Sequence, residues 1–148
     1  MSGMGFEFTE TMAGTAEWDR EPGKRRPFRF DITAHADSTR DHLATGLATI
    51  RGTVYAPPVT RAGPAEGTIE IRVLGKKIIR YALGFVGDGG ERYELVGQKD
   101  ISYLHPFTSF TVLPAEILDA NQHRVATCVT RFDLRRHGWR FLRSFAWA

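Results

Sequence analysis

The chain has 148 residues and a mass of 16.6 kDa, the size of one domain with a core of its own. Hydrophobic residues make up 42% and charged residues 25%, which excludes a disordered or collagen-like chain. The formal net charge is +3, and no apolar run approaches the roughly 20 residues that a membrane-spanning helix needs. We therefore expect residues 1–148 to form a single domain with no transmembrane segment.

The start of the chain and the cysteine content indicate the compartment. The first residues, MSGMGFEFTETM, contain neither the basic nor the apolar region of a secretory signal peptide. Cys128 is the only cysteine, so an intrachain disulfide cannot form. It lies in an apolar, strand-like run, which favours a small buried side chain over a reactive thiol. We expect a cytoplasmic protein.

Most segments alternate between apolar and polar residues with a period of two, the pattern of a half-buried strand. In one of them Phe28, Phe30 and Ile32 point one way, whereas Arg29 and Asp31 point the other way. Such alternation is typical of antiparallel sheets with one solvated face. We expect eight to nine strands, near residues 5–13, 27–36, 47–55, 67–74, 77–86, 91–100, 107–113 and 123–132.

Glycine and proline mark the connections between these strands. Pro57 and Pro58 end the third strand, because proline cannot donate to a ladder, and residues 59–67 are expected to form a loop. Residues 87–90, Gly-Asp-Gly-Gly, predict a hairpin turn. Further turns are expected at residues 74–77 and 119–121.

Two segments look helical. Residues 38–44 predict one helical turn, and the segment after Asp133 carries apolar residues at helical spacing. A strand remains an alternative for the second segment, because its aromatic residues share a parity.

About eight antiparallel strands must also protect their edges, and closure into a barrel does so. The predicted fold is all-β: an antiparallel, lipocalin-like (calycin-like) barrel of about eight strands with a C-terminal helix.

Positive charge is concentrated at the C-terminal end. Residues 131–148 hold five arginines and one aspartate, a net charge of +4, which leaves −1 for the rest (3 − 4 = −1). Arg136, Arg140 and Arg143 could dock an acidic partner, or anionic lipid with Trp139 and Trp147 as anchors, or could form a solvated helix face. The basic residues are few and follow no reader motif, so we expect no nucleic-acid partner.

Motifs that define enzymes are missing from the sequence. The five histidines show no zinc spacing, and neither a Gly-x-Ser-x-Gly elbow nor a dinucleotide-binding Gly-x-Gly-x-x-Gly occurs. We therefore predict no catalytic residues, no metal and no cofactor, and a non-catalytic role is favoured. A small cofactor-free enzyme, with scattered residues inside the barrel, remains an alternative.

Glu10 is the most informative charged residue. It shares its parity with Phe6, Phe8 and Met12, so it points inward if that face is the apolar one. A buried carboxylate needs a partner, which Arg80 or Lys99 could supply. A structural pair is the favoured interpretation, and exposure at a strand end or an acid–base catalyst are the alternatives.

Several motifs together resemble a known family. Residues 6–14, FEFTETMAG, resemble the FTExMxG segment that opens the accessory β domain of bacterial cholesterol-oxidase-like proteins in the GMC oxidoreductase group. Gly-Thr-Val at residues 52–54, GTIEI at 67–71, and the pair of segments at 79–85 and 93–99 resemble the following strands of that domain. The likeness runs from about residue 5 to 145. It implies a stand-alone accessory module without the flavin domain, and hence without its oxidase activity.

The barrel prediction and this resemblance together suggest a function. We expect a non-catalytic barrel that binds an apolar small molecule, lipid-like or sterol-like. The predicted polar contacts are Glu10 and Lys99. An interaction module that docks on a separately encoded oxidoreductase is the second hypothesis, and plain core packing of the aromatic residues is the simpler alternative. The predicted cavity-lining residues are Phe30, Ile71, Tyr81, Phe85 and Tyr93.

Overall fold

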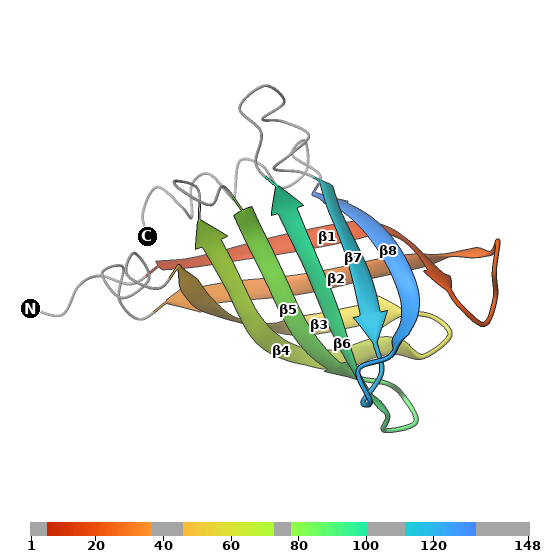
Figure 1. The fold of residues 1–148 in the computed structure, drawn as a ribbon. Helices are drawn as coiled ribbons and strands as arrows, with labels where there is room; N and C mark the ends of the chain where they lie inside the picture. The colour runs from red at the N-terminus through yellow and green to blue at the C-terminus, as the bar shows by residue number, and fades with distance from the viewer. Residues whose placement is uncertain (1–5, 37–45, 73–77, 101–111, 133–148) are drawn as a thin grey trace, which may run out of the picture.

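The computed structural model describes residues 6–36, 46–72, 78–100 and 112–132. They form eight strands that pair antiparallel in chain order, and β1 also pairs with β8, which closes the barrel (Figure 1). The prediction of an all-β, closed antiparallel barrel is thereby confirmed. The strands are β1 (Phe6–Trp18), β2 (Arg25–Ala36), β3 (Leu47–Ala56), β4 (Thr60–Arg72), β5 (Ile78–Val86), β6 (Arg92–Asp100), β7 (Val112–Leu118) and β8 (Arg124–Phe132).

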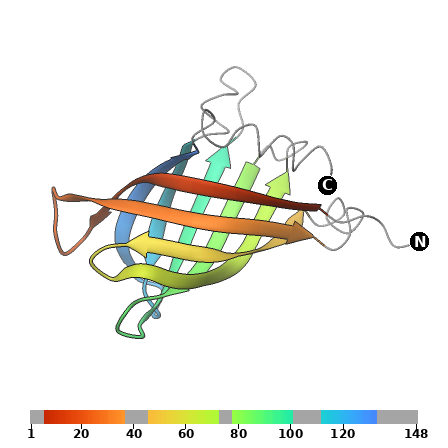
Figure 2. The ribbon, with the colours of Figure 1, turned by 180° about the vertical axis from the view of Figure 1, so that it is seen from behind.

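The barrel has two ends of different construction. Four short connections, at residues 19–24, 57–59, 87–91 and 119–123, lie at one end, which we call the turn end. Odd-numbered strands begin and even-numbered strands finish at the opposite end, which we call the far end. Figure 2 shows the long β1–β2 hairpin projecting at the turn end. The predicted turns at 87–90 and 119–121 are confirmed, because the amide of Gly87 bonds the carbonyl of Glu91 and that of Asp119 bonds the carbonyl of His123, both at 2.8 Å.

Three strand boundaries were predicted wrongly. Strand β4 begins at Thr60 rather than near residue 67, since the chain reverses in a tight turn closed by the Val59 amide and the Ala56 carbonyl at 2.9 Å. Within β4, Pro64 pairs opposite Thr53. Strand β1 continues past residue 13 to Trp18, and β7 continues past residue 113 to Leu118, while residues 107–111 of its predicted range lie outside the described residues. The predicted helices at 38–44 and after Asp133, and the turn at 74–77, lie outside the described residues.

Three glycines at positions that share the parity of the buried residues on their strands let neighbouring strands come close together. A Cβ at Gly14, Gly52 or Gly67 would overlap a carbonyl oxygen of the adjacent strand, that of Val129, Asp31 or Ala82 respectively. Only glycine allows this approach without a clash, and such positions are where barrel strands bend most sharply. In Figure 1 the strands of the front and back walls accordingly cross steeply. The glycine at position 14 therefore continues β1 instead of ending it.

The predicted inward faces carry the core. Phe28, Phe30, Ile32 and Ala34 of β2 are buried, as are the predicted inward residues of β5 from Ile79 to Phe85. The polar residues that alternate with them face solvent or are partly covered. The period-two pattern therefore predicts correctly which side chains fill the barrel.

Candidate functional site

The interior of the barrel contains a small cluster of charged and polar side chains. Glu10 on β1, Tyr81 on β5 and Lys99 on β6 are 6%, 1% and 3% exposed, and we call them the polar cluster. The Tyr81 hydroxyl donates a 2.6 Å hydrogen bond to Glu10 Oε1. The Lys99 ammonium lies 3.8 Å from Glu10 Oε2 and 5.2 Å from the centre of the Tyr81 ring. Both oxygens of the carboxylate therefore have a partner.

The geometry decides between the two partners that the sequence left open for Glu10. Lys99 forms the buried ion pair. Arg80 instead faces solvent on β5, where its guanidinium donates to Gln98 Oε1 at 3.0 and 3.2 Å and lies 3.7 Å from Glu70 Oε2. The alternation of β5 explains this outcome, because Arg80 and the inward Tyr81 are consecutive residues and point to opposite sides of the sheet.

Burial shifts the proton affinities of two cluster members in opposite directions. The pKa of Tyr81 is raised well above its ordinary value, first by burial and then by the negative charge of Glu10 and the hydrogen bond to it. The pKa of Lys99 is lowered, because burial disfavours the ammonium more strongly than Glu10 favours it. The cluster thus holds a phenol that keeps its proton and an amine that releases its proton more readily than usual.

The surroundings of the polar cluster are apolar. The Phe30 ring meets the Tyr81 ring edge-on, with ring centres 6.0 Å apart. Along the ladders, Tyr81 pairs with Ile69 and Lys99 pairs with Ile79, and Ile79 in turn pairs with the partly buried Ile71. Three of the predicted cavity residues, Phe30, Ile71 and Tyr81, therefore adjoin the predicted polar contacts.

The other two predicted cavity residues lie elsewhere. Phe85 and Tyr93 stack with ring centres 5.4 Å apart, and Tyr93 also meets Trp18 edge-on at 6.3 Å. The Trp18 indole donates to the Pro57 carbonyl at 3.1 Å, so this group fills the barrel at the turn end. Toward the far end, the buried residues of the described strands are mostly smaller or aliphatic, with Phe132 of β8 as an aromatic exception. They include Ala34, Ala36, Ala48, Ile69 and Ile79.

Thr130 is an interior polar residue that the sequence analysis missed. It lies on β8, is 1% exposed, and its hydroxyl oxygen has no hydrogen-bond partner in the structure. The alternation of Ala126, Cys128, Thr130 and Phe132 on one face was the available signal. An unpaired buried hydroxyl costs free energy, so its hydrogen-bonding capacity is available to a ligand.

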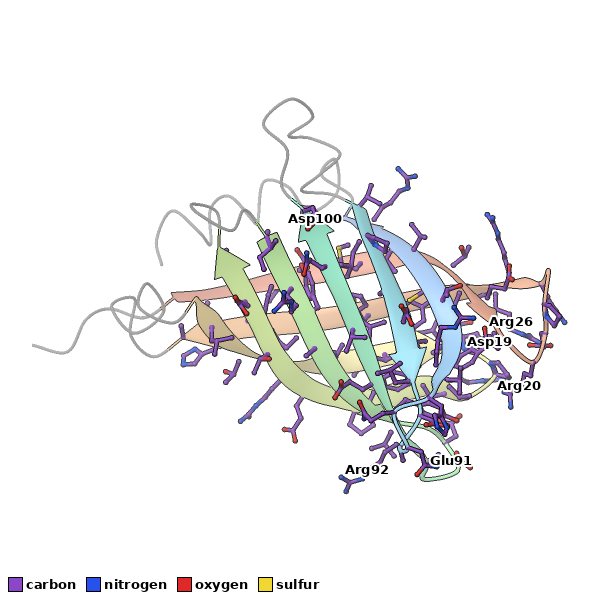
Figure 3. All side chains as sticks on the ribbon, viewed as in Figure 1. Asp19, Arg20, Arg26, Glu91, Arg92 and Asp100 are labelled. Carbon is purple, nitrogen blue, oxygen red and sulfur yellow. The ribbon has the colours of Figure 1, made fainter. Side chains whose placement is uncertain are left out.

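Hollows on the outside of the barrel have a different character. One of about 560 Å³ lies over β6 to β8 and includes Val96, Pro114 and Val129. Another of about 220 Å³ lies at the turn end beside Trp18 and Tyr93. The charged residues at its rim already have contacts, because Arg124 pairs with Asp19 at 3.2 Å and Arg20 lies over the Trp18 ring. Figure 3 shows Asp19 and Arg20 at the turn end of the barrel.

The proposed docking residues Arg136, Arg140 and Arg143 lie outside the described residues. Within the described ranges, no three His, Cys, Asp or Glu side chains gather closely enough to hold a metal ion. The same ranges contain no helix long and apolar enough to cross a membrane.

Comparison of the sequence with protein-family models and with curated proteins gives no match. The resemblance to the accessory β domain of the GMC oxidoreductase group therefore stays a prediction that rests on the motifs alone. What the fold and the site define is a class: a closed eight-stranded antiparallel barrel with a charged cluster in an apolar interior.

Proposed function

We propose that this protein is a lipocalin-like barrel that binds one small amphipathic molecule in the far-end half of its interior. The apolar body of the ligand, lipid-like or sterol-like, lies among the aliphatic side chains, and its polar group meets the polar cluster. The observation that carries the proposal is the ion pair of Glu10 and Lys99, with side chains 4% and 2% exposed inside an apolar barrel.

A buried ion pair contributes little to the stability of the folded protein by itself. Removing two charges from water costs several kcal/mol per ion, and well-packed apolar residues in their place often give an equally stable or more stable protein. Lys99 can donate three hydrogen bonds, whereas its distance of 3.8 Å from Glu10 exceeds a hydrogen bond. The Thr130 hydroxyl also lacks a partner. A ligand with a hydroxyl, carbonyl or carboxylate group would use this donor capacity.

The dimensions of the fold are compatible with this role. A barrel of eight strands is just wide enough to be filled by side chains or to hold one small ligand. Trp18, Phe85 and Tyr93 fill the turn end, whereas several alanines and isoleucines, together with Phe132, are buried toward the far end. Ligand sites in barrels combine such apolar walls with a few polar groups.

Dodecanol binding, counted by native mass spectrometry, tests the proposal. Ala48 is the position to fill, because it faces inward on β3 and pairs with Ile69, which pairs with Tyr81. Ala48→Phe is expected to weaken one-to-one binding about tenfold, equivalent to ~1.4 kcal/mol. Thr49→Phe is the control: the neighbouring residue faces solvent, and its substitution should leave affinity unchanged. Absence of saturable binding, or equal effects of the two substitutions, would contradict the proposal.

The small cofactor-free enzyme is the second candidate. It is favoured by a specific observation, the opposite pKa shifts of Tyr81 and Lys99 around one carboxylate, because such pairs of groups are common where protons are transferred. Turnover of a carbonyl compound that Lys99→Met abolishes would support it. The docking module rests on arginines outside the described residues.

A further inference from the structure

Among the described residues, the basic residue buried in the interior is a lysine, the less common of the two long basic residue types in this chain. Of its 20 basic residues, sixteen are arginines, and the only lysines are Lys24, Lys76, Lys77 and Lys99. One of these four is buried inside the barrel beside Glu10. A guanidinium would pair with a carboxylate through two hydrogen bonds and would keep its charge at any accessible pH. Lysine differs from arginine in that it can lose its proton and act as a nucleophile.

The groups around the Lys99 amine suit that chemistry. Glu10 Oε2 lies 3.8 Å from Nζ, close enough to stabilise a positive charge on the nitrogen and to exchange a proton with small movement. The hydrogen bond from Tyr81 occupies Oε1, so the other carboxylate oxygen remains directed to the amine. Burial lowers the pKa of Lys99, which enlarges the fraction of neutral amine. The apolar walls limit access of bulk water.

We propose that Lys99 binds an apolar aldehyde covalently, as an imine, inside the barrel. This inference rests on the proposed function, because the aldehyde must occupy the same interior. The Lys99 ammonium first passes a proton to Glu10. The neutral amine then attacks the carbonyl carbon, a C–N bond forms, and a proton moves from the attacking nitrogen to the carbonyl oxygen. Loss of water from this carbinolamine breaks the C–O bond and leaves the imine, so the sum is amine plus aldehyde giving imine plus water. Neither an oxidant nor a reductant is required. Glu10 then returns its proton to the imine nitrogen, so the protonated imine carries the positive charge that the ammonium had, and Glu10 faces it as a carboxylate.

Reductive trapping locates the reacting lysine. The wild-type protein is incubated with dodecanal and cyanoborohydride, which converts an imine into a stable secondary amine, and the product is analysed by intact mass and peptide mapping. One adduct on Lys99 is expected. The variant Lys24→Arg, Lys76→Arg, Lys77→Arg keeps Lys99 as its only lysine and should react equally. It changes no residue of the polar cluster, so the result does not depend on whether a core variant folds.

The control is Lys99→Met, in which the interior adduct should disappear. Adducts confined to Lys24, Lys76, Lys77 or the chain terminus would overturn the inference. Dodecanol distinguishes covalent capture from the proposed noncovalent binding, because an alcohol cannot form an imine. If dodecanol binds one-to-one and Lys99 remains unmodified by dodecanal, covalent capture is wrong and the binding function stands. If neither compound binds, both are wrong.

Discussion

The Tyr81 hydroxyl and Glu10 Oε1 are 2.6 Å apart, although 71 positions separate the two residues in the chain. Their strands are not neighbours, because β1 pairs with β2 and β8, and β5 pairs with β4 and β6. The hydrogen bond therefore crosses the interior. It ties opposite walls of the barrel together and fixes the orientation of the carboxylate toward Lys99.

Removal of this bond should reduce stability. Tyr81→Phe leaves Glu10 buried with one oxygen unpaired, and hydrogen bonds to charged groups contribute ~1.5–3 kcal/mol. We expect the free energy of unfolding in urea to fall by about 2 kcal/mol. Tyr55→Phe is the matched control, since Tyr55 is only partly buried on β3 beneath Arg29. A similar loss in both variants would show that the cross-barrel bond contributes nothing specific.

Two equally buried threonines should respond in opposite ways to the same substitution. Thr130 and Thr60 are each 1% exposed, but the Thr60 hydroxyl donates to Asp88 Oδ1 at 2.9 Å, whereas that of Thr130 has no partner. Thr130→Val is expected to raise the unfolding free energy by about 1 kcal/mol, because an unsatisfied polar group is removed. Thr60→Val should lower it by a comparable amount. Thermal unfolding of the two variants measures these changes. A destabilised Thr130→Val would show that the Thr130 hydroxyl has a hydrogen-bond partner in the folded protein.

The close approach at Gly52 makes it the most sensitive glycine to test. In Gly52→Ala the new methyl group would overlap the Asp31 carbonyl oxygen, so the strands must separate, at a cost of about 3 kcal/mol or more. Gly84→Ala is the control, because a Cβ there would lie 3.5 Å from the Glu66 carbonyl oxygen, an ordinary contact. Urea denaturation should show a large loss for the first variant and almost none for the second. Equal stability of the two would refute the close approach of the two strands at Gly52.

Cys128 predicts a specific loss of stability at high pH. Burial raises the pKa of its thiol from 9.0 to about 12. Above pH 9 the unfolded chain releases this proton while the folded chain keeps it, so the unfolded state is favoured progressively up to pH 12. Between pH 8 and pH 10 the wild-type protein should lose about 1.4 kcal/mol more than Cys128→Ala. Parallel pH profiles for the two proteins would mean that the thiol is accessible in the folded state.

The sequence predicts local features well and cross-barrel contacts poorly. The faces of β2 and β5 follow from alternation, because burial on one side of a sheet is itself a period-two property. Inward-facing Glu10 was predictable for the same reason. The choice of Lys99 over Arg80, and the contact with Tyr81, depend on which residues of opposite walls reach one another. That relation is set by strand tilt and register around the whole barrel. The start of β4 was missed because a loop was predicted over residues 59–67 after Pro57 and Pro58. In the structure these two prolines form a tight turn, and Pro64 pairs within the strand that follows.

The most direct test of the account is to locate bound dodecanol by methyl chemical shifts. Ile69, Ile71 and Ile79 belong to the far-end interior around the polar cluster, whereas Val96 and Val129 face outward. Saturation with dodecanol should shift the three isoleucine methyl signals and leave the two valines unchanged. Shifts confined to the outward valines, with no change at the isoleucines, would contradict an interior binding site.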